Sequence, residues 1–171
     1  MDTKYKLKTA EDLYEKLKFE LRRIEQSECF EYDFWNVVVT AWHLNNEWIK
    51  SNAEADPSLR TKVNKVPPQV ETFLRLIQDI ANGSKHLRLD AKSSSKSVVD
   101  VVHSREVNDW YQYFFYPFDG YDVDEYYFSP EDVVDLISLY FEWVFNKKQT
   151  HQDDPKKLLD KLEEQKTKKT W

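Results

Sequence analysis

Apolar residues recur at helical spacing in several stretches of the chain, and this periodicity limits the fold to a mainly helical one. Thr9 followed by Asp12 matches the reciprocal capping pattern of a helix N-terminus, and leucines then repeat one turn apart. This pattern predicts an amphipathic helix over residues 9–27. In residues 33–50 the apolar side chains cover more than half of the helical circumference, which predicts the most buried helix of the fold.

Two further helices are predicted later in the chain. Pro67 and Pro68 suit the first turn of a helix, and apolar residues at helical spacing extend this helix over residues 68–82. The sequence Ser-Pro-Glu-Asp, which begins at Ser129, supplies a cap, a first-turn proline and a reciprocal acid for the last strong helix. Four such helices predict a bundle.

The periodicity changes between the third and fourth helices. Residues 98–128 are rich in β-branched and aromatic side chains, and Asp119-Gly120 is a dipeptide typical of hairpin turns. We therefore expect a mainly α fold, in which a four-helix bundle carries a small β-hairpin appendage. This domain is expected to span residues 1–150.

The last segment, residues 151–171, is highly charged. A helix is expected around residues 156–165, but its apolar surface consists of only three side chains, those of Leu158, Leu159 and Leu162. So small a surface predicts a tail that docks weakly and that folding does not require.

Composition excludes several classes of protein. The net charge of −6 opposes binding to a phosphate backbone, and no apolar run is long enough to span a membrane. The single cysteine, Cys29, rules out an internal disulfide framework and is expected to be a small buried residue. The N-terminal residues are charged where an export signal needs an apolar core. We expect a cytoplasmic protein with no membrane or nucleic-acid partner.

A polar stripe interrupts the second helix at Asn36, Thr40, His43 and Glu47. One hypothesis makes it a catalytic site, with His43 as acid or base and Glu47 orienting it. The other makes it the ordinary solvent face of the helix, with a weak ion pair one turn apart. The pattern favours the second interpretation.

Gly83 poses a question about where the third helix ends. A left-handed Gly83 would end the helix at Asn82, whereas a continuous helix would align Asp79, Asn82 and His86 on one stripe. Composition favours the cap, because glycine inside a helix costs about 1 kcal/mol relative to alanine. Periodicity leaves both arrangements open.

Three segments together resemble an uncharacterised prokaryotic branch of the HEPN superfamily: YDFWNVVVTAWHLNNEWI, LIQDIANGSKHLRLD and ISLYFEWVF. The resemblance covers residues 9–145 by the order of the elements. It implies a compact helical bundle that often forms a homodimer through its helices. It also implies a role as a metal-independent RNase toxin or anti-phage effector, or as an inactive structural relative of these.

The catalytic signature of that superfamily is an arginine followed, after four to six residues, by a histidine. Here Asn82 and His86 match the spacing, but Ala81 stands in the arginine position. An arginine there stabilises charge on phosphate, and Lys85 would supply charge without the bidentate geometry. With Ala81 in the arginine position, the resemblance implies a non-catalytic binding component of an anti-phage defence or toxin–antitoxin system. The alternative is an RNase centred on His86 and assisted by Asn82, Lys85, His43 and Glu47.

No pattern in the sequence predicts a metal or cofactor. His43, Glu47 and His86 could supply two imidazoles and one carboxylate, but their spacing matches no known metal motif. Two glycines in the whole chain cannot build a phosphate-binding loop.

Between Glu106 and Asn146 there is no lysine or arginine, although this stretch holds more than half of the aromatic residues. The aromatic side chains either pack on the bundle or form a protein-binding surface whose acids attract a basic partner. The residues expected in such a surface are Trp110, Tyr111, Tyr113, Phe115, Asp119, Asp122 and Asp124. The same stretch supports a second alternative function, an acidic inhibitor of a nucleic-acid-binding protein.

Overall fold

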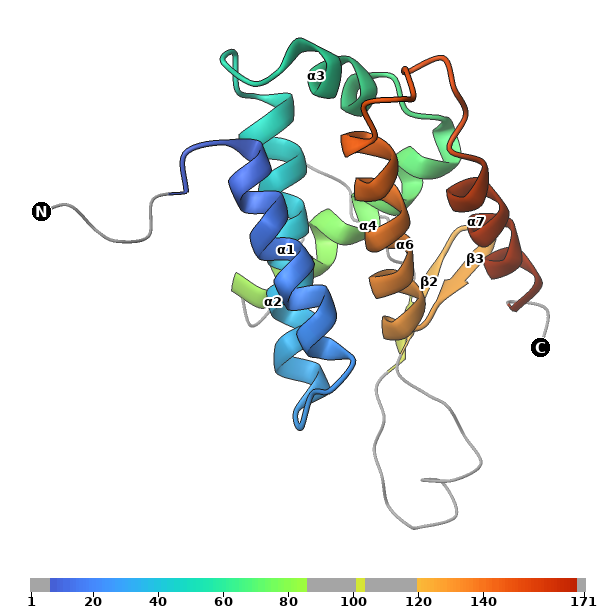
Figure 1. The fold of residues 1–171 in the computed structure, drawn as a ribbon. Coiled ribbons are helices and arrows are strands. Elements are labelled where there is room, and N and C mark those ends of the chain that lie inside the picture. The colour runs from blue at the N-terminus through green and yellow to red at the C-terminus, as the bar shows by residue number, and fades with distance from the viewer. Residues whose placement is uncertain (1–6, 86–100, 104–119, 169–171) are drawn as a thin grey trace, which may run out of the picture.

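The computed structural model describes residues 7–85, 101–103 and 120–168. It is mainly helical and includes a small antiparallel sheet, as the sequence predicts (Figure 1). Among the described residues, no helix combines the length and the apolar composition needed to span a bilayer.

Helices α1 (Ala10–Ile24) and α2 (Phe30–His43) lie side by side (Figure 1). The predicted cap of α1 is confirmed, because the Asp12 amide donates to Thr9 Oγ1 at 3.2 Å and the Thr9 amide donates to Asp12 Oδ2 at 3.0 Å. Apolar side chains of both helices, including Leu17 and Val37, are fully buried. Cys29 precedes α2 and is exposed, so the expectation that it is buried is wrong.

The second predicted helix changes its hydrogen-bond register halfway along. After His43 the chain continues as a π-helix, η1 (Leu44–Lys50), whose last bond runs from the Ser51 amide to the Asn46 carbonyl at 2.9 Å. The side chain of Asn45 is buried in this turn and accepts a 2.6 Å hydrogen bond from the Tyr140 hydroxyl. Burial raises the pKa of Tyr140, so its hydroxyl stays protonated as a donor.

The short helix α3 (Pro57–Asn64) was not predicted from the sequence. Its apolar residues are few, and only Leu59 and Val63 contribute apolar side chains to the core. Its N-terminus has a clear cap, because Asp56 Oδ1 accepts a 2.7 Å hydrogen bond from the Ser58 amide.

Helix α4 (Pro68–Lys85) continues through Gly83, which does not have a positive φ. The cap favoured by composition is therefore wrong, and the helical alternative is correct. Among the described residues, no atom lies within 4 Å of a Cβ built at Gly83, so close approach of a neighbouring helix does not explain this glycine either.

Three strands form an antiparallel sheet in the order β1 (Val101–His103), β2 (Gly120–Val123) and β3 (Tyr126–Phe128). The hairpin turn predicted at Asp119-Gly120 is wrong, because Gly120 pairs with His103 inside the sheet.

The tight turn instead joins β2 to β3 at Asp124, whose φ is 50°. Gly120 instead leaves room for the end of the Tyr127 side chain, whose hydroxyl oxygen and two nearest ring carbons lie 2.3–2.6 Å from where a Cβ would stand.

One face of this sheet packs on the helices. Val123 and Phe128 are fully buried and Tyr126 nearly so, and the Phe128 ring lies 6.1 Å from the ring of Phe73 in α4. The neighbouring β2 residue, Asp122, is only partly buried. Successive side chains of a strand point to opposite faces. Only one face of the described part of the hairpin therefore packs on the helices.

Helix α6 (Pro130–Phe145) has the predicted cap, since the Asp132 amide donates to Ser129 Oγ at 3.1 Å. It is followed by α7 (Lys156–Lys168), which contacts α6, β3 and α4 (Figure 1). Leu158 and Leu162 are each only 1% exposed. The prediction of a weakly docked tail is therefore wrong. The two leucines are buried because α7 packs against β3 and α6.

Removing α7 should destabilise the whole domain. We expect truncation after Gln149 to lower the thermal midpoint by ten degrees or more, because two buried leucines alone are worth several kcal/mol. Calorimetry on the truncated and full chains measures this change. The full-length variant Lys157→Ser, at an exposed position of α7, is the matched control and should melt like the unchanged chain. An unchanged midpoint after the truncation would contradict the docking of α7.

The two glycines should respond oppositely to alanine. Gly83→Ala should stabilise the protein by up to about 1 kcal/mol, because alanine favours the helix and its Cβ meets open space. Gly120→Ala should destabilise it, because the new Cβ collides with the Tyr127 ring. Urea titrations of both variants test this, and a destabilising Gly83→Ala would show that α4 ends before residue 83.

Candidate functional site

The structure splits the polar stripe of α2 and η1. His43 Nδ1 lies 2.9 Å from Glu47 Oε2, and both side chains face solvent, 30% and 56% exposed. Thr40 is buried instead and accepts a 2.8 Å hydrogen bond from Lys16 Nζ of α1. Asn36 is exposed. Thr40 thus belongs to the contact between α1 and α2, and His43 and Glu47 form a local contact at the surface, which favours the interpretation of the stripe as an ordinary helix face.

The predicted catalytic group on α4 is only partly placed. Asn82 is partly buried, and Lys85 ends the described part of the helix. Ala81, in the position of the signature arginine, is fully buried in the core. His86 lies outside the described residues, so a groove between His86 and the second helix remains a prediction.

Most of the predicted binding surface also lies outside the described residues. This applies to Trp110, Tyr111, Tyr113, Phe115 and Asp119. The structure places the other two, Asp122 within β2 and Asp124 at the turn between β2 and β3, where it is exposed.

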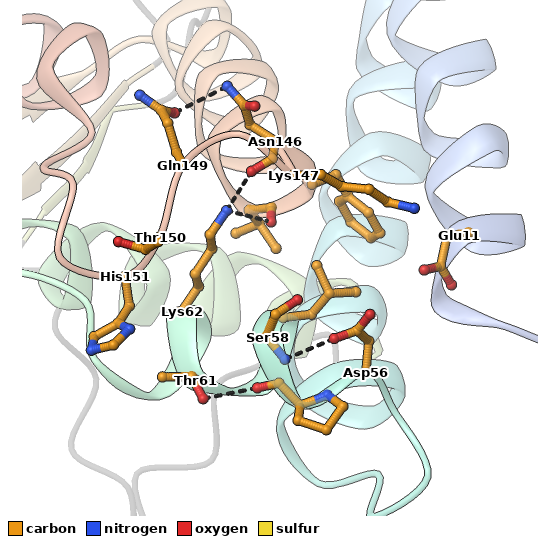
Figure 2. Close-up of a pocket in the computed structure, with 14 residues that line it drawn as sticks. Glu11, Asp56, Ser58, Thr61, Lys62, Asn146, Lys147, Gln149, Thr150 and His151 are labelled. Carbon is orange, nitrogen blue, oxygen red and sulfur yellow. Dashed lines mark hydrogen bonds between the residues drawn. The ribbon is translucent and has the colours of Figure 1, made fainter.

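A cavity of about 570 Å³ lies where the start of α1, helix α3 and the end of α6 converge (Figure 2). This volume is in the range of small-molecule sites. The loop from α6 to α7 forms another wall through Lys147, Thr150 and His151. The apolar part of the lining consists of Pro57, Leu59, Val144 and Phe145.

Lys62 of α3 closes the wall of this cavity at the C-terminal end of α6. It is 3% exposed, and its Nζ donates to the Trp143 carbonyl at 2.9 Å. It also donates to the carbonyls of Val144 at 3.1 Å and Asn146 at 2.8 Å (Figure 2). An ammonium group has three protons, so all of its donors are used. Burial lowers the pKa of Lys62, and the carboxylate of Asp153 opposes this change. Lys62 is therefore a structural cap of α6.

The loop after α6 is held by its own hydrogen bonds. The Thr150 amide and hydroxyl donate to Asp153 Oδ2 at 2.6 and 3.0 Å, and the backbone bond is the main reason why the pKa of Asp153 is lowered. The indole of Trp143 donates to the Asp153 carbonyl at 3.0 Å. These contacts fix the loop against α6 before α7 begins.

The charged side chains are spread along the cavity. Figure 2 shows Glu11, Asp56 and Lys147 on one side of it, Lys62 in the middle and His151 on the opposite side. Hydrogen bonds from Ser58, with a smaller contribution from Lys147, lower the pKa of Asp56. Both carboxylates are exposed, so they are open to a ligand at the mouth of the cavity.

Sequence reasoning missed this cavity because it missed α3. A lysine in a short polar helix looks like any solvent-exposed lysine, and only the packing of α3 on α6 buries Lys62. The Asp56-Pro57-Ser58 start of α3 is a cap signal that could have been found.

Among the described residues, no three histidine, cysteine, aspartate or glutamate side chains are placed to hold a metal ion. No family model matches the chain, and no curated protein or solved structure matches it.

Loss of the Lys62 ammonium should lower the stability of the folded protein. We expect Lys62→Met, which keeps the apolar stem, to lower the free energy of unfolding by about 3 kcal/mol, because it leaves buried carbonyls without donors. Lys65→Met, at an exposed position that ends the same helix, is the control and should change stability by less than about 0.5 kcal/mol. Equal effects in denaturant titrations would refute the capping role.

Proposed function

We propose that this protein is a non-catalytic, HEPN-like binding component that acts on a protein partner. In this proposal α1, α2, α4 and α6 are the counterparts of the four bundle helices. The setting, a prokaryotic anti-phage defence or toxin–antitoxin system, is the one that the sequence resemblance implies.

The burial of Ala81 carries the non-catalytic part of the proposal. This side chain has no exposed surface, so the position that corresponds to the signature arginine points into the core. A guanidinium must reach a phosphate to stabilise its charge, and this direction does not allow it. The contact between His43 and Glu47 joins two side chains one helical turn apart at the surface, which supports the same conclusion.

The sheet supports the binding part of the proposal. His103 and Gly120, which flank residues 104–119 in the sequence, pair with each other in the sheet. That segment contains Trp110, Tyr113 and most of the other residues expected to bind. Its acids and aromatic side chains suit a basic protein partner.

We expect the purified protein to leave RNA intact, because the arginine position is alanine. The assay compares total RNA incubated with the wild type, with His86→Ala and with His151→Ala, which controls for contaminating nuclease. Cleavage that only His86→Ala abolishes would establish the RNase alternative.

The same preparations test binding. Once a partner has been identified, Trp110→Ser combined with Tyr113→Ser should abolish its capture without changing the thermal midpoint, because these aromatic side chains supply the contact area. Surface variants Lys18→Ser and Lys157→Ser are the controls. Undiminished capture by the aromatic variant would place the binding surface elsewhere.

A further inference from the structure

Helix α7 brings positive charge to an acidic surface. Strands β2 and β3 and helix α6 lie within residues 120–145, which contain no lysine or arginine. The cations that face their acids come from α7. Lys161 Nζ lies 3.5 Å from Asp135 Oδ2 of α6, and Lys166 Nζ lies 2.8 Å from Glu125 Oε1 in the turn between β2 and β3. The surface beneath α7 therefore suits a helix with basic residues.

The apolar contact of α7 is made by side chains one helical turn apart. Leu158 and Leu162 are each 1% exposed, and α7 lies against β3, α6 and α4 (Figure 1). Lys161 and Lys166 follow Leu158 at i+3 and i+8 on the same helix. The surface thus accepts a defined pattern, with apolar residues at i and i+4 and basic residues at i+3 and i+8. Such a pattern is typical of a helix that binds in a groove.

Two features make α7 an imperfect occupant of this surface. Gln165 is fully buried, and among the described residues its Oε1 has no hydrogen-bond donor. Its Nε2 donates to the Lys161 carbonyl of α7 itself, at 2.9 Å. A buried acceptor without a donor weakens docking, whereas an apolar side chain at this position would not. The first turn of α7 also has Lys156 and Lys157 and no acid at the positive end of the helix.

We propose that the surface of β3 and α6 beneath α7 is a docking site for a basic amphipathic helix of a partner protein, and that α7 is its displaceable occupant. A partner helix with the same pattern and an apolar residue in place of Gln165 makes the contacts of α7 without the unpaired oxygen. The partner competes with a tethered helix, whose effective concentration is about one millimolar. This inference goes beyond the proposed function, because it concerns α7 and not residues 104–119.

Hydrogen exchange of the full chain tests whether α7 is displaceable. We expect amides in the middle of α7 to exchange at least ten-fold faster than those of α6, because α7 opens while the rest stays folded. Gln165→Leu should slow exchange in α7 by ten-fold or more and leave α6 within two-fold. Gln69→Leu, the same change at an exposed position of α4, is the control and should alter neither helix. Equal exchange of α6 and α7, or no effect of Gln165→Leu, would overturn the inference.

A labelled synthetic peptide of residues 154–168 tests the docking site. With Gln165→Leu, it should bind the full chain saturably, at least ten-fold more tightly than the unchanged peptide, and should shift the α7 amides. A peptide that also carries Lys161→Glu and Lys166→Glu should bind at least ten-fold more weakly, because the surface is acidic. Absence of binding, equal binding of the charge-reversed peptide, or unshifted α7 amides would each contradict the proposal.

A third peptide, with Leu158→Ser and Leu162→Ser, keeps all of the charges and should not bind. Binding by this peptide would show attraction between opposite charges without a docking site, and would refute the inference. Sedimentation of the full chain separates a partner helix from a second copy of this chain. A dimer that the Gln165→Leu peptide dissociates would make the α7 of a second copy the occupant, against the inference.

Discussion

The buried ammonium of Lys62 joins parts of the chain that are far apart in sequence. It brings α3 against the last carbonyls of α6 and against the first residue of the loop that leads to α7. Without it, the negative end of α6 would face apolar surroundings with unpaired carbonyls. The Trp143 ring lies 5.6 Å from the same Nζ, and its indole donates to Asp153 further along the loop. The position of α7 and the wall of the cavity both follow from this contact.

Helix α6 is held by polar contacts along its whole length. Ser129 and Asp132 cap its start, the Tyr140 hydroxyl reaches Asn45 in its middle, and Lys62 closes its end. The Tyr140 contact depends on η1, which places a buried amide beside the hydroxyl. A buried donor and acceptor that satisfy each other avoid the cost of leaving either one unpaired, and this pair links η1 to the middle of α6. The cavity thus lies at one end of α6 and the sheet near the other.

Elements whose signals are local could be predicted from the sequence. The capping boxes at Thr9 and Ser129 and the apolar periodicity of the long helices predicted α1, α4 and α6 closely, since each signal lies within a few residues. Local rules failed at the two glycines, in opposite ways. Gly83 looks like a helix stop but lies within α4, and Gly120 looks like a turn but lies in a strand under the Tyr127 ring.

The sequence by itself determined the helical class, the caps, the change to strands after α4, and the absence of an arginine at position 81. Tertiary structure decided the rest, because it depends on partners distant in sequence. Leu158 and Leu162 looked too few to dock until β3 and α6 supplied the opposing surface. Lys62 looked like a solvent-facing lysine until the end of α6 met it. Whether a side chain is buried or exposed depends on which distant residues pack against it. A single sequence does not show which residues those are.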